Sequence, residues 1–404
     1  MLAPESARWS ALVARFARRA AQAGFGLVLS PAFEDVEVFR RSSGESSEVV
    51  TKEMYEFEDK GGRQIALRPE GTASVVRAFV QHRPQVPFKA WYVAPMFRYE
   101  RPQKGRFRQH HQLGVETIGT DDPHADVEVI ALLAGLYRDL GITRPELRLN
   151  SLGDADCAPN YREVLGAYLG SHSEELCDEH RERWSHNPLR VLDCKRLPCR
   201  AVSSGAPRLS DHLCEECRAH IASVRAGLES LSIPFRADDF LVRGLDYYSR
   251  TAFEFGDGVG GGGRYDGLVS ALGGPAVSGV GFGAGIERIL LACDEEGVFG
   301  DEITSRPLDA YVIDMSDGLE GLKLRHELRE AGFYADGDFD GRSLKARMRA
   351  ADRSGARVAL LLGTGEAGSG SVAMRVLRGD GGHSQQEVAR GELAGRLGEV
   401  VRRS

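Results

Sequence analysis

The chain has 404 residues, more than one ordinary hydrophobic core requires, so two domains and an insertion are expected. Hydrophobic residues make up 42% and charged residues 27% of it, a balance typical of soluble globular proteins. No apolar run reaches the roughly 18 residues that a membrane span needs. Residues 1–20 have the pattern of an amphipathic helix rather than that of a secretory signal. These features argue against a membrane protein and predict a cytoplasmic one.

The formal net charge of −7 argues against a surface that binds nucleic acid everywhere, but it is compatible with local basic patches. Six of the seven cysteines lie between Cys157 and Cys217. Because the chain shows no export signal, this clustering favours reduced thiols or a metal site over disulfides.

Residues 24–119 alternate short apolar runs with turns, which predicts a meander of antiparallel strands. The run EFEDKGGRQIAL (56–67) is typical of a hairpin about a Gly-Gly turn, and 70–82 has helical spacing. Two further strands are expected at 91–100 and 110–119. Too few helices intervene for a parallel sheet.

Further along, 125–142 predicts a helix and 146–153 a strand, and strand patterns resume over 239–255, 260–269 and 279–285. Between them, residues from about 157 to 236 are helical in pattern, charged and rich in cysteine. We therefore predict an α+β fold, in which helices flank an antiparallel sheet, over residues 1–300, with an insertion at about 157–236. A linker is expected at 301–306, within the acidic stretch 294–307. Alternating strand and helix patterns then predict an α/β domain over 307–404.

The segment FRYERPQKGRFRQHHQLGVE (97–116) is a charged loop between two strand patterns. Period-two alternation places Arg98 and Glu100 on one face, and Gln112 and Glu116 on one face of the second strand. Guanidinium groups are suited to phosphate oxygens. A solvated hairpin with ion pairs is the alternative, but the flanking apolar residues favour a cleft wall.

The segment GVGFGAGIERILLAC (279–293) has four glycines at period two, followed by Glu287 and Arg288 at the start of a helix. Such a strand permits close approach of a ligand or of another backbone, and the helix start favours an anion. A tightly packed strand–helix corner without a ligand is the alternative.

These two segments resemble motifs 2 and 3 of class II aminoacyl-tRNA synthetases, and SPAFEDVEVF (30–39) resembles the dimer-forming motif 1. LVRGLDYYSRTAFEF (241–255) and GGGGRYDGLV (260–269) resemble the two histidine-specific motifs of the histidyl enzymes, and LRPEGTASVVRA (67–78) fits the same family. The resemblance runs from about Ala32 into the C-terminal region, whose GDFDGRSLKARMRAADRSGARVALLLG (337–363) is similar to the family's anticodon-binding domain. The chain is thus identified as a member of the histidyl-tRNA synthetase family.

The resemblance implies a homodimer that activates histidine with ATP, accompanied by magnesium, as histidyl-adenylate and transfers the histidyl group to the 3′ end of tRNA(His). It also implies site roles. Arg98 would hold the α-phosphate and the activated carboxylate, and Glu100 would lie near adenine. Arg106 and Arg288 would contact the outer phosphates, with Arg288 also packing on adenine. The implied histidine-binding residues are Glu70, Thr72 and Gln112 at the α-ammonium, Glu116 and Tyr248 at the imidazole nitrogens, and Tyr247 and Tyr265 along the pocket.

The chemistry of histidine agrees with this assignment, because its ring offers one donor and one acceptor and a selective pocket needs a carboxylate and a hydroxyl. For Tyr247 and Tyr248, core packing is the alternative. The resemblance also implies a place for Arg243 beside the α-phosphate. Because negative charge develops there during adenylate formation, Arg243 is the expected catalytic residue. It lies in the strand-like run LVRGLDYY, where it shares a face with Leu245.

Three features depart from the family pattern. His110 stands where the pattern has an adenine-stacking Phe, the connection between Glu254 and Gly261 is short, and no basic strand precedes residues 30–39. The last feature leaves the N-terminal edge of the fold open.

The insertion contains Cys177-x2-His180, Cys194-x4-Cys199 and Cys214-x2-Cys217. These spacings suit a structural zinc ion, most simply with the last four cysteines as ligands. Reduced structural cysteines near the tRNA acceptor stem are the alternative.

In the C-terminal domain, five basic residues lie on one helical stretch that could meet phosphates: Arg342, Lys345, Arg347, Arg349 and Arg353. A solvated helix face is the alternative.

Two other functions are compatible with the same fold. A non-catalytic, histidyl-synthetase-like regulatory subunit of ATP phosphoribosyltransferase usually lacks the C-terminal domain and has eroded histidine motifs, whereas this chain retains both. A class II synthetase for threonine, proline or glycine is disfavoured by residues 241–255 and Glu116.

Overall fold

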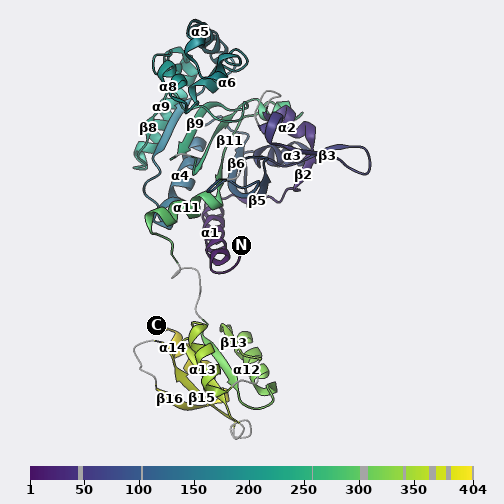
Figure 1. Ribbon diagram of the computed structural model, residues 1–404, viewed down its shortest axis with the longest axis vertical. Helices are drawn as coiled ribbons and strands as arrows, with labels where there is room; N and C mark the ends of the chain where they lie inside the picture. The colour runs from purple at the N-terminus through teal and green to yellow at the C-terminus, as the bar shows by residue number, and fades with distance from the viewer. Residues whose placement is uncertain are drawn as a thin grey trace. The chain divides into compact units, whose positions relative to one another are not determined.

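The computed structural model describes residues 1–43, 49–101, 103–256, 258–300, 308–339, 343–363, 370–378 and 384–402 (Figure 1). The chain divides into two units, Met1–Thr304 and Ser305–Ser404, and each is described by itself. The predicted linker at 301–306 lies outside the described residues. Of the described helices, none is both long and apolar enough to cross a membrane.

The first unit is built on an eight-stranded sheet in the order β1-β5-β6-β11-β10-β9-β7-β8. Its inner strands pair antiparallel, as predicted, and only the edge pairs β1–β5 and β7–β8 are parallel. The predicted meander is wrong in its order, because β6 lies between β5 and β11 rather than beside only its neighbours in the chain. The strands are β1 (Gly26–Leu27), β5 (Phe88–Phe97), β6 (Gln109–Ile118), β7 (Leu147–Ser151), β8 (Arg236–Ala237), β9 (Ser249–Phe255), β10 (Gly260–Tyr265) and β11 (Gly279–Gly285).

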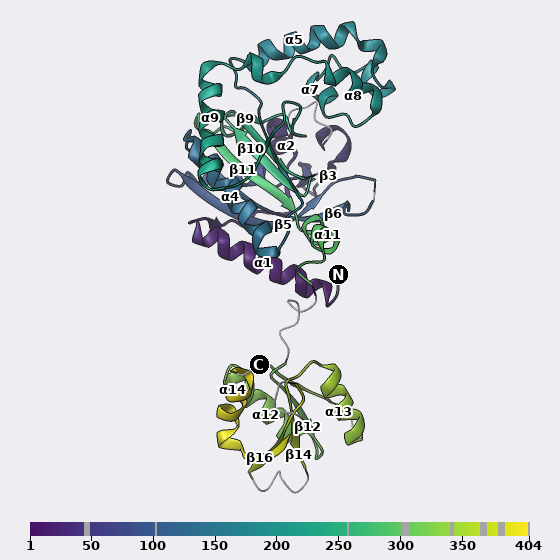
Figure 2. The same cartoon turned by 90° about the vertical axis from the view of Figure 1, so that its left-hand side faces the viewer.

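Alternation along the central strands separates a core face from a functional face. Leu113 and Val115 of β6 belong to the same buried cluster as Leu12 and Phe16 of α1 (Glu5–Gln22). Helix α4 (Pro123–Leu140) lies beside α1 on this face (Figure 2). Because successive side chains on a strand point to opposite faces, Gln112 and Glu116 are directed away from this core.

Between β1 and β5, the chain forms a small three-stranded sheet in the order β2-β4-β3. The same part of the chain contains α2 (Val36–Ser43) and α3 (Thr72–His82). Its strands are β2 (Phe33–Asp35), β3 (Tyr55–Glu58) and β4 (Gln64–Leu67). The predicted hairpin is confirmed, because β3 and β4 pair antiparallel and Gly62 of the turn has a φ of 78°. A short helical segment, Val49–Glu53, precedes β3. Helix α3 packs on the β5 end of the main sheet.

The insertion is helical, as predicted. Its helices are α5 (Ala158–Ser171), α6 (Asp178–Arg181), α7 (Leu189–Leu192), α8 (Leu197–Ser204) and α9 (Glu215–Ser230), with single turns at Ser173–Glu175 and Leu209–His212. The long α9 returns the chain to the core and packs against α4. Two more helices, α10 (Leu268–Ala271) and α11 (Ile286–Glu296), flank β11 in the chain.

The segment 241–248, predicted as a strand, is a loop, and β9 begins only at Ser249. Its backbone forms no strand ladder, and two of its polar groups bond to the insertion. Arg190 donates to the Gly244 carbonyl oxygen at 2.9 Å, and Asn187 donates to Asp246 at 3.3 Å. The expected face shared by Arg243 and Leu245 therefore does not exist.

The second unit has a five-stranded mixed sheet in the order β13-β12-β14-β15-β16. Its strands are β12 (Ala310–Asp314), β13 (Ala335–Gly337), β14 (Val358–Leu362), β15 (Ser371–Val376) and β16 (Gln385–Ala389). Residues of α12 (Leu319–Glu330) and α14 (Leu393–Arg402) share one buried cluster, and those of α13 (Leu344–Arg353) another. A C-terminal α/β unit is thus confirmed.

The described basic residues of the predicted stretch lie on different faces of α13. Arg347 points inward, donates to the Asp314 carbonyl oxygen and forms an ion pair with Asp338 at 3.4 Å, so the prediction that it meets phosphates is wrong. Lys345, Arg349 and Arg353 are exposed. Arg342 lies outside the described residues.

One buried ion pair fixes β10 to α4. Arg264 and Asp126 are both fully buried, and the guanidinium also donates to the carbonyl oxygens of Thr120 at 2.8 Å and Asp122 at 3.1 Å. His220 of α9 contacts the same carboxylate at 3.3 Å. Burial opposes ionisation of Asp126, but the His220 and Arg264 contacts hold its pKa below the usual value.

We expect Arg264→Met to lower the free energy of unfolding by about 3–5 kcal/mol, because the buried Asp126 carboxylate would lose its counter-charge. Urea unfolding followed by circular dichroism measures this change. Arg236→Met is the matched control, since its pair with Glu146 is half exposed and contributes less than about 1 kcal/mol. Equal losses in the two variants would contradict the proposed role of the buried pair.

Candidate functional site

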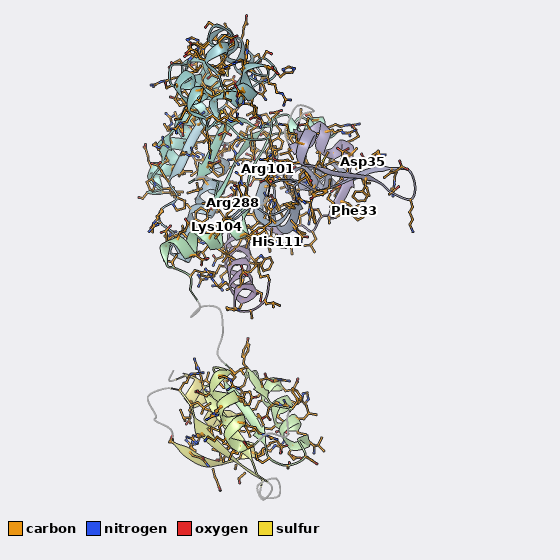
Figure 3. The ribbon with its side chains drawn as sticks, viewed as in Figure 1. Phe33, Asp35, Arg101, Lys104, His111 and Arg288 are labelled. Atoms are coloured by element: carbon orange, nitrogen blue, oxygen red, sulfur yellow. The ribbon has the colours of Figure 1, made fainter. Side chains whose placement is uncertain are left out.

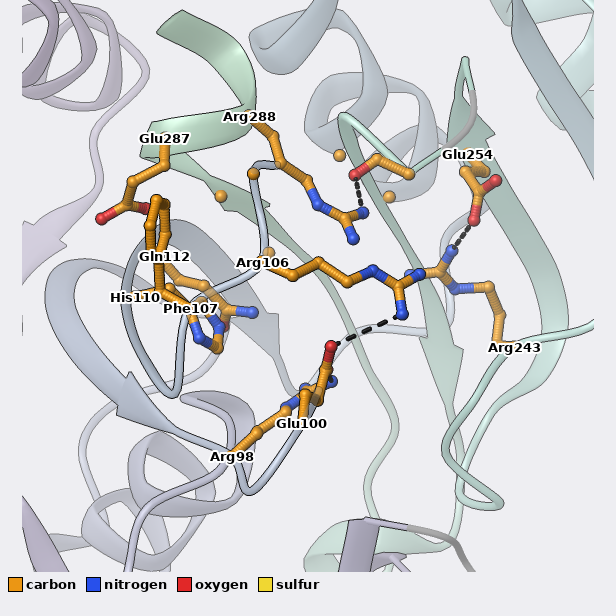
Figure 4. A pocket seen from close by; sticks show the side chains of 16 residues that line it. Arg98, Glu100, Arg106, Phe107, His110, Gln112, Arg243, Glu254, Glu287 and Arg288 are labelled. Atoms are coloured by element: carbon orange, nitrogen blue, oxygen red, sulfur yellow. Dashed lines mark hydrogen bonds and ion pairs between the residues drawn. The ribbon is translucent and has the colours of Figure 1, made fainter. Parts of the chain in front are cut away.

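A cleft opens on the functional face of the main sheet, over β6, β10 and β11. Figure 4 shows that charged side chains from separate segments converge in it. It brings together six of the residues predicted from the sequence: Arg98, Glu100, Arg106, Gln112, Arg243 and Arg288. Arg288, at the start of α11, also marks this region in the whole-chain view, near His111 (Figure 3).

Three arginines give one side of the cleft a concentrated positive charge. Arg288 donates to the Gly258 carbonyl oxygen at 2.6 Å. Burial and the neighbouring charge of Arg106 both lower the pKa of Arg288 from its usual value. Arg98 donates to the Pro69 carbonyl oxygen at 2.8 Å. Since these cations lie close together, an anion with several oxygens would be stabilised among them.

Glu100 offsets part of this charge. Its carboxylate lies 3.4 Å from Arg106 and 4.0 Å from Arg98. These contacts hold the side chain at the mouth of the arginine cluster.

Arg243 enters the cleft from the loop before β9. Its Nη1 donates to Glu254 Oε2 at 2.6 Å (Figure 4). A Cβ on Gly261 would lie 2.8 Å from the guanidinium, so a glycine is required there. Among the described residues, the buried Nε–H of Arg243 has no acceptor. A buried unpaired donor is unfavourable, so this group is suited to an anionic ligand.

Glu254 was not predicted as a site residue. It lies on β9 and binds Arg148 of β7 as well as Arg243, and thereby links the loop to two strands. From the sequence, strand alternation places Glu254 on the same face as Arg250 and Ala252. Alternation along one strand does not reveal a partner such as Arg243, which lies in a loop.

A buried cluster of polar side chains surrounds Glu116 of β6, which is itself fully buried. Its carboxylate accepts from Thr72 Oγ1 at 2.6 Å and from the Tyr265 hydroxyl at 2.8 Å. Gly281 lies opposite it in the sheet, where a Cβ would clash with the carboxylate at 1.9 Å. Burial raises the pKa of Glu116 to about 8, although both hydrogen bonds oppose the rise.

Three tyrosine rings lead from this cluster toward Arg243. Tyr247 lies 4.6 Å from Tyr248 and 5.9 Å from Tyr265 between ring centroids. The guanidinium of Arg243 lies 5.7 Å from the Tyr248 ring. Arg243 lines the cationic cleft and also a second cavity with Tyr247 and Tyr248, so the two cavities adjoin at this residue. Tyr92 was not predicted as a site residue, although strand alternation places it on the same face as Arg98. It is buried on β5, and a Cβ on Gly114 would meet its hydroxyl at 2.4 Å.

Glu70 lies at the start of α3, where it accepts from the backbone N–H groups of Thr72 at 2.6 Å and Ala73 at 2.9 Å. Burial raises its pKa, and these two bonds oppose the rise. Gln112 lies across from Gly285 on β11 and lines the arginine cleft.

His110 also lines the cleft, and burial followed by the charge of Arg98 lowers its pKa to about 4. Near pH 7 it is therefore a neutral ring. The adjacent His111 contacts Glu287 of α11 at 2.9 Å, a pair that was not predicted.

The arrangement places a cationic cleft beside a cavity lined by Tyr247 and Tyr248, whose rings lead to the buried Glu116 carboxylate. It can hold a polyphosphate next to a small polar ring. A sequence model described as histidyl-tRNA synthetase matches residues 1–289, and one described as anticodon binding domain matches residues 309–399. The chain belongs to the histidyl-tRNA synthetase family.

Two relatives show how far the likeness to this family extends. A histidine–tRNA ligase of Anaeromyxobacter dehalogenans is 46% identical over 407 residues, which cover 98% of this chain and 97% of that protein. The solved structure of apo histidyl-tRNA synthetase from S. aureus has a TM-score of 0.80 and 34% identity, covering 98% of this chain and 97% of that one.

A solved protein of Bacillus halodurans, named as an ATP phosphoribosyltransferase regulatory subunit/histidyl-tRNA synthetase, has a TM-score of 0.62 at 20% identity. The match covers 86% of this chain and 93% of that one. At this identity the likeness concerns the fold alone.

The cysteines of the insertion form two groups rather than one. Cys194 and Cys199 lie with Cys177 and His180, whereas Cys214 and Cys217 lie with Asp154 and Cys157. The prediction of one site with Cys194, Cys199, Cys214 and Cys217 as ligands is therefore wrong. Chain spacing could not reveal that each pair has its partners elsewhere in the chain, at 177–180 and at 154–157.

Proposed function

We propose that this chain is a histidine–tRNA ligase that forms histidyl-adenylate from histidine and ATP and then transfers the histidyl group to the 3′ end of tRNA(His). The observation that carries the proposal is that Arg243 lines both the cationic cleft and a second cavity with Tyr247 and Tyr248, whose rings lead to the buried Glu116. Each cavity suits one substrate, and the arginine lies where the two would react.

ATP would occupy the cationic cleft as its magnesium complex. Arg106 and Arg288 would bind the outer phosphates, and Arg98 would bind the α-phosphate and the carboxylate that attacks it. Arg288 would also pack on adenine, with Glu100 at the ring edge. The neutral His110 ring would stack on the other side of the base, where its size provides a weaker contact than a Phe would.

Histidine would bind beside the tyrosine rings and the Glu116 carboxylate. Its α-ammonium would lie near Glu70, Thr72 and Gln112. Its imidazole would meet Glu116 on one ring nitrogen and Tyr248 on the other, with Tyr247 and Tyr265 as walls. Thr72 and Tyr265 already donate to Glu116, so the carboxylate is held in place before the substrate arrives.

The chemical step is an in-line attack of the histidine carboxylate on the α-phosphorus. It needs no protein nucleophile, because alignment and charge stabilisation lower the barrier. The carboxylate and the α-phosphate repel each other, and the Arg243 guanidinium between them would offset this repulsion. Its unpaired Nε–H is the donor that would be directed at the developing charge.

Glu254 would act as a positioning residue. Its carboxylate accepts a hydrogen bond from Arg243 Nη1 and also binds Arg148 of β7. These contacts link the Arg243 guanidinium to the sheet. The remaining donors of Arg243 would then be oriented before substrate binds, which reduces the reorganisation that accompanies the reaction.

We further propose that residues 1–300, with the insertion at about 157–236, form the catalytic core of a homodimer that pairs through residues 30–39. Residues 307–404 would bind the anticodon region of the tRNA. Support for the tRNA contact comes from the anticodon-binding sequence model and from the exposed Lys345, Arg349 and Arg353.

The alternative is a non-catalytic regulatory subunit of ATP phosphoribosyltransferase. The retained Arg98, Arg243 and Glu116, together with the second unit, favour the ligase. Amino-acid-dependent exchange of pyrophosphate into ATP decides between them. The ligase gives exchange with histidine and none with threonine, proline or glycine, and no exchange with any amino acid would overturn the proposal.

Arg243→His should slow adenylate formation by a factor of about 10²–10³, because one contact to the transition state is lost. Transfer from preformed histidyl-adenylate to tRNA should change much less, since attack at phosphorus is complete by then. Single-turnover measurement of both half-reactions tests this, with Arg236→His as the control. Activation within a few-fold of wild type would make Arg243 a structural residue.

Histidine affinity should increase as the pH rises toward about 8, because the pKa of Glu116 in the free protein is about 8 and its carboxyl group ionises over this range. The ionised carboxylate accepts the imidazole N–H, so binding below this pH must release a proton. The dissociation constant should therefore be about fivefold weaker at pH 7 than at pH 8.

Calorimetry at the two pH values measures this difference. Glu116→Gln should bind about 1–3 kcal/mol more weakly and lose the pH dependence. A flat wild-type profile would mean that Glu116 binds histidine in its protonated form.

Removal of residues from about 307 onward should reduce aminoacylation of tRNA far more than histidine-dependent pyrophosphate exchange. The reason is that every proposed adenylate-forming residue lies in the first unit. Circular dichroism and sedimentation of the truncated chain provide the control for folding and assembly. Equal loss in both assays would mean that the second unit supports the catalytic core.

A further inference from the structure

Two groups of four metal-binding side chains lie in and beside the insertion, outside the cleft. The first is Cys177, His180, Cys194 and Cys199, and the second is Asp154, Cys157, Cys214 and Cys217. In each group the four potential ligand atoms lie within 4.8 Å of one another.

The first group has the spacing of a tetrahedral site. Cys177 Sγ lies 3.9 Å from Cys194 Sγ and 3.2 Å from His180 Nδ1, and Cys199 Sγ lies 3.7 Å from the same nitrogen. Ligands about 2.0–2.3 Å from zinc at tetrahedral angles are about 3.5–3.8 Å apart. The group therefore surrounds a space of the size that one zinc ion fills.

The second group has similar spacing around one carboxylate. Cys157 Sγ and Cys217 Sγ are 3.8 Å apart. Asp154 Oδ2 lies 3.0 Å from Cys217 Sγ and 3.5 Å from Cys214 Sγ. Arg250 of β9 lies 3.7 Å from this oxygen and offsets part of the negative charge that three thiolates and a carboxylate would carry.

Disulfides do not account for either group. All seven cysteines are free, and sulfur separations of 3.8–3.9 Å are far from a bond of about 2.05 Å. Backbone N–H groups are directed at the sulfurs instead, from Cys177 to Cys199 Sγ and from Cys217 to Cys214 Sγ, each at 3.4 Å. Such donors stabilise thiolates that bind a metal.

The local structure around the first group is too short to be stable alone. Helices α6 and α7 have four residues each, far below the length at which a helix persists without tertiary support. A cross-link between Cys177, before α6, and Cys194 and Cys199, after α7, would supply that support.

We propose that the chain binds two structural zinc ions, one in each group. Four protein ligands close each site, and three thiolates select zinc over magnesium, calcium or manganese. The first ion cross-links the interior of the insertion. The second cross-links the two ends of the insertion. Asp154 and Cys157 lie where the chain enters the insertion, and Cys214 and Cys217 lie at the start of α9, which leads back to the core. This inference is independent of the proposed ligase activity.

Elemental analysis of the full chain, exposed to excess zinc and then dialysed exhaustively, tests the proposal. The expected content is two zinc ions per chain, and one or none overturns it. Cobalt(II) titration of the metal-free protein is a second measurement, with an endpoint expected at two equivalents and the absorption of tetrahedral thiolate coordination. An endpoint below two, or octahedral absorption, would likewise overturn it.

Three variants assign the ligands. Cys194→Ser and Cys214→Ser should each retain one ion, whereas Cys293→Ser, the matched control, should retain two because its buried thiol on α11 lies in neither group. Two ions in either ligand variant, or fewer than two in folded Cys293→Ser, would contradict the assignment. The wild-type content decides the number of sites even where a ligand variant does not fold.

Discussion

The ion pair between Arg243 and Glu254 is the contact on which the geometry of the cleft depends. Arg243 lies in a loop rather than in a strand, so its backbone alone does not fix the guanidinium. Glu254 supplies this constraint from β9, and Arg148 binds the same carboxylate from β7. The arginine is thereby held between the arginine cluster and the tyrosine pocket, with its buried Nε–H unpaired among the described residues. This is the arrangement expected where binding energy is reserved for charge that develops in a transition state.

The main sheet makes this arrangement possible because its two faces carry different kinds of side chain. One face packs on α1 and α4 as an apolar core, and the other carries the charged and aromatic side chains of the site. Glycines on β10 and β11 leave space where large groups must lie against the sheet, as at Gly261 beneath Arg243 and Gly281 opposite Glu116. The glycines of these two strands therefore leave room for the side chains of the candidate site.

Patterns local to the chain predicted most of the fold. Period-two alternation identified β5 and β6 and placed Glu116 and Gln112 on one face, and the Gly-Gly turn identified the β3–β4 hairpin. The errors arise where distant segments determine the structure. The loop at 241–248 bonds to the insertion, Arg347 turns inward to Asp314, and the cysteines divide between two groups. Tyr92 and Glu254 were missed for the same reason, since their partners are brought to them only by the sheet.

The central claim is that Glu254 acts in catalysis through Arg243 alone, and a double-mutant cycle on the single-turnover rate of adenylate formation tests it most directly. The cycle compares wild type, Glu254→Gln, Arg243→His and the double variant. Residues that act as one unit are not additive, so the double variant should be no slower than Arg243→His. If the two losses multiplied instead, Glu254 would act independently of Arg243, and its role as a positioning residue for that arginine would be contradicted.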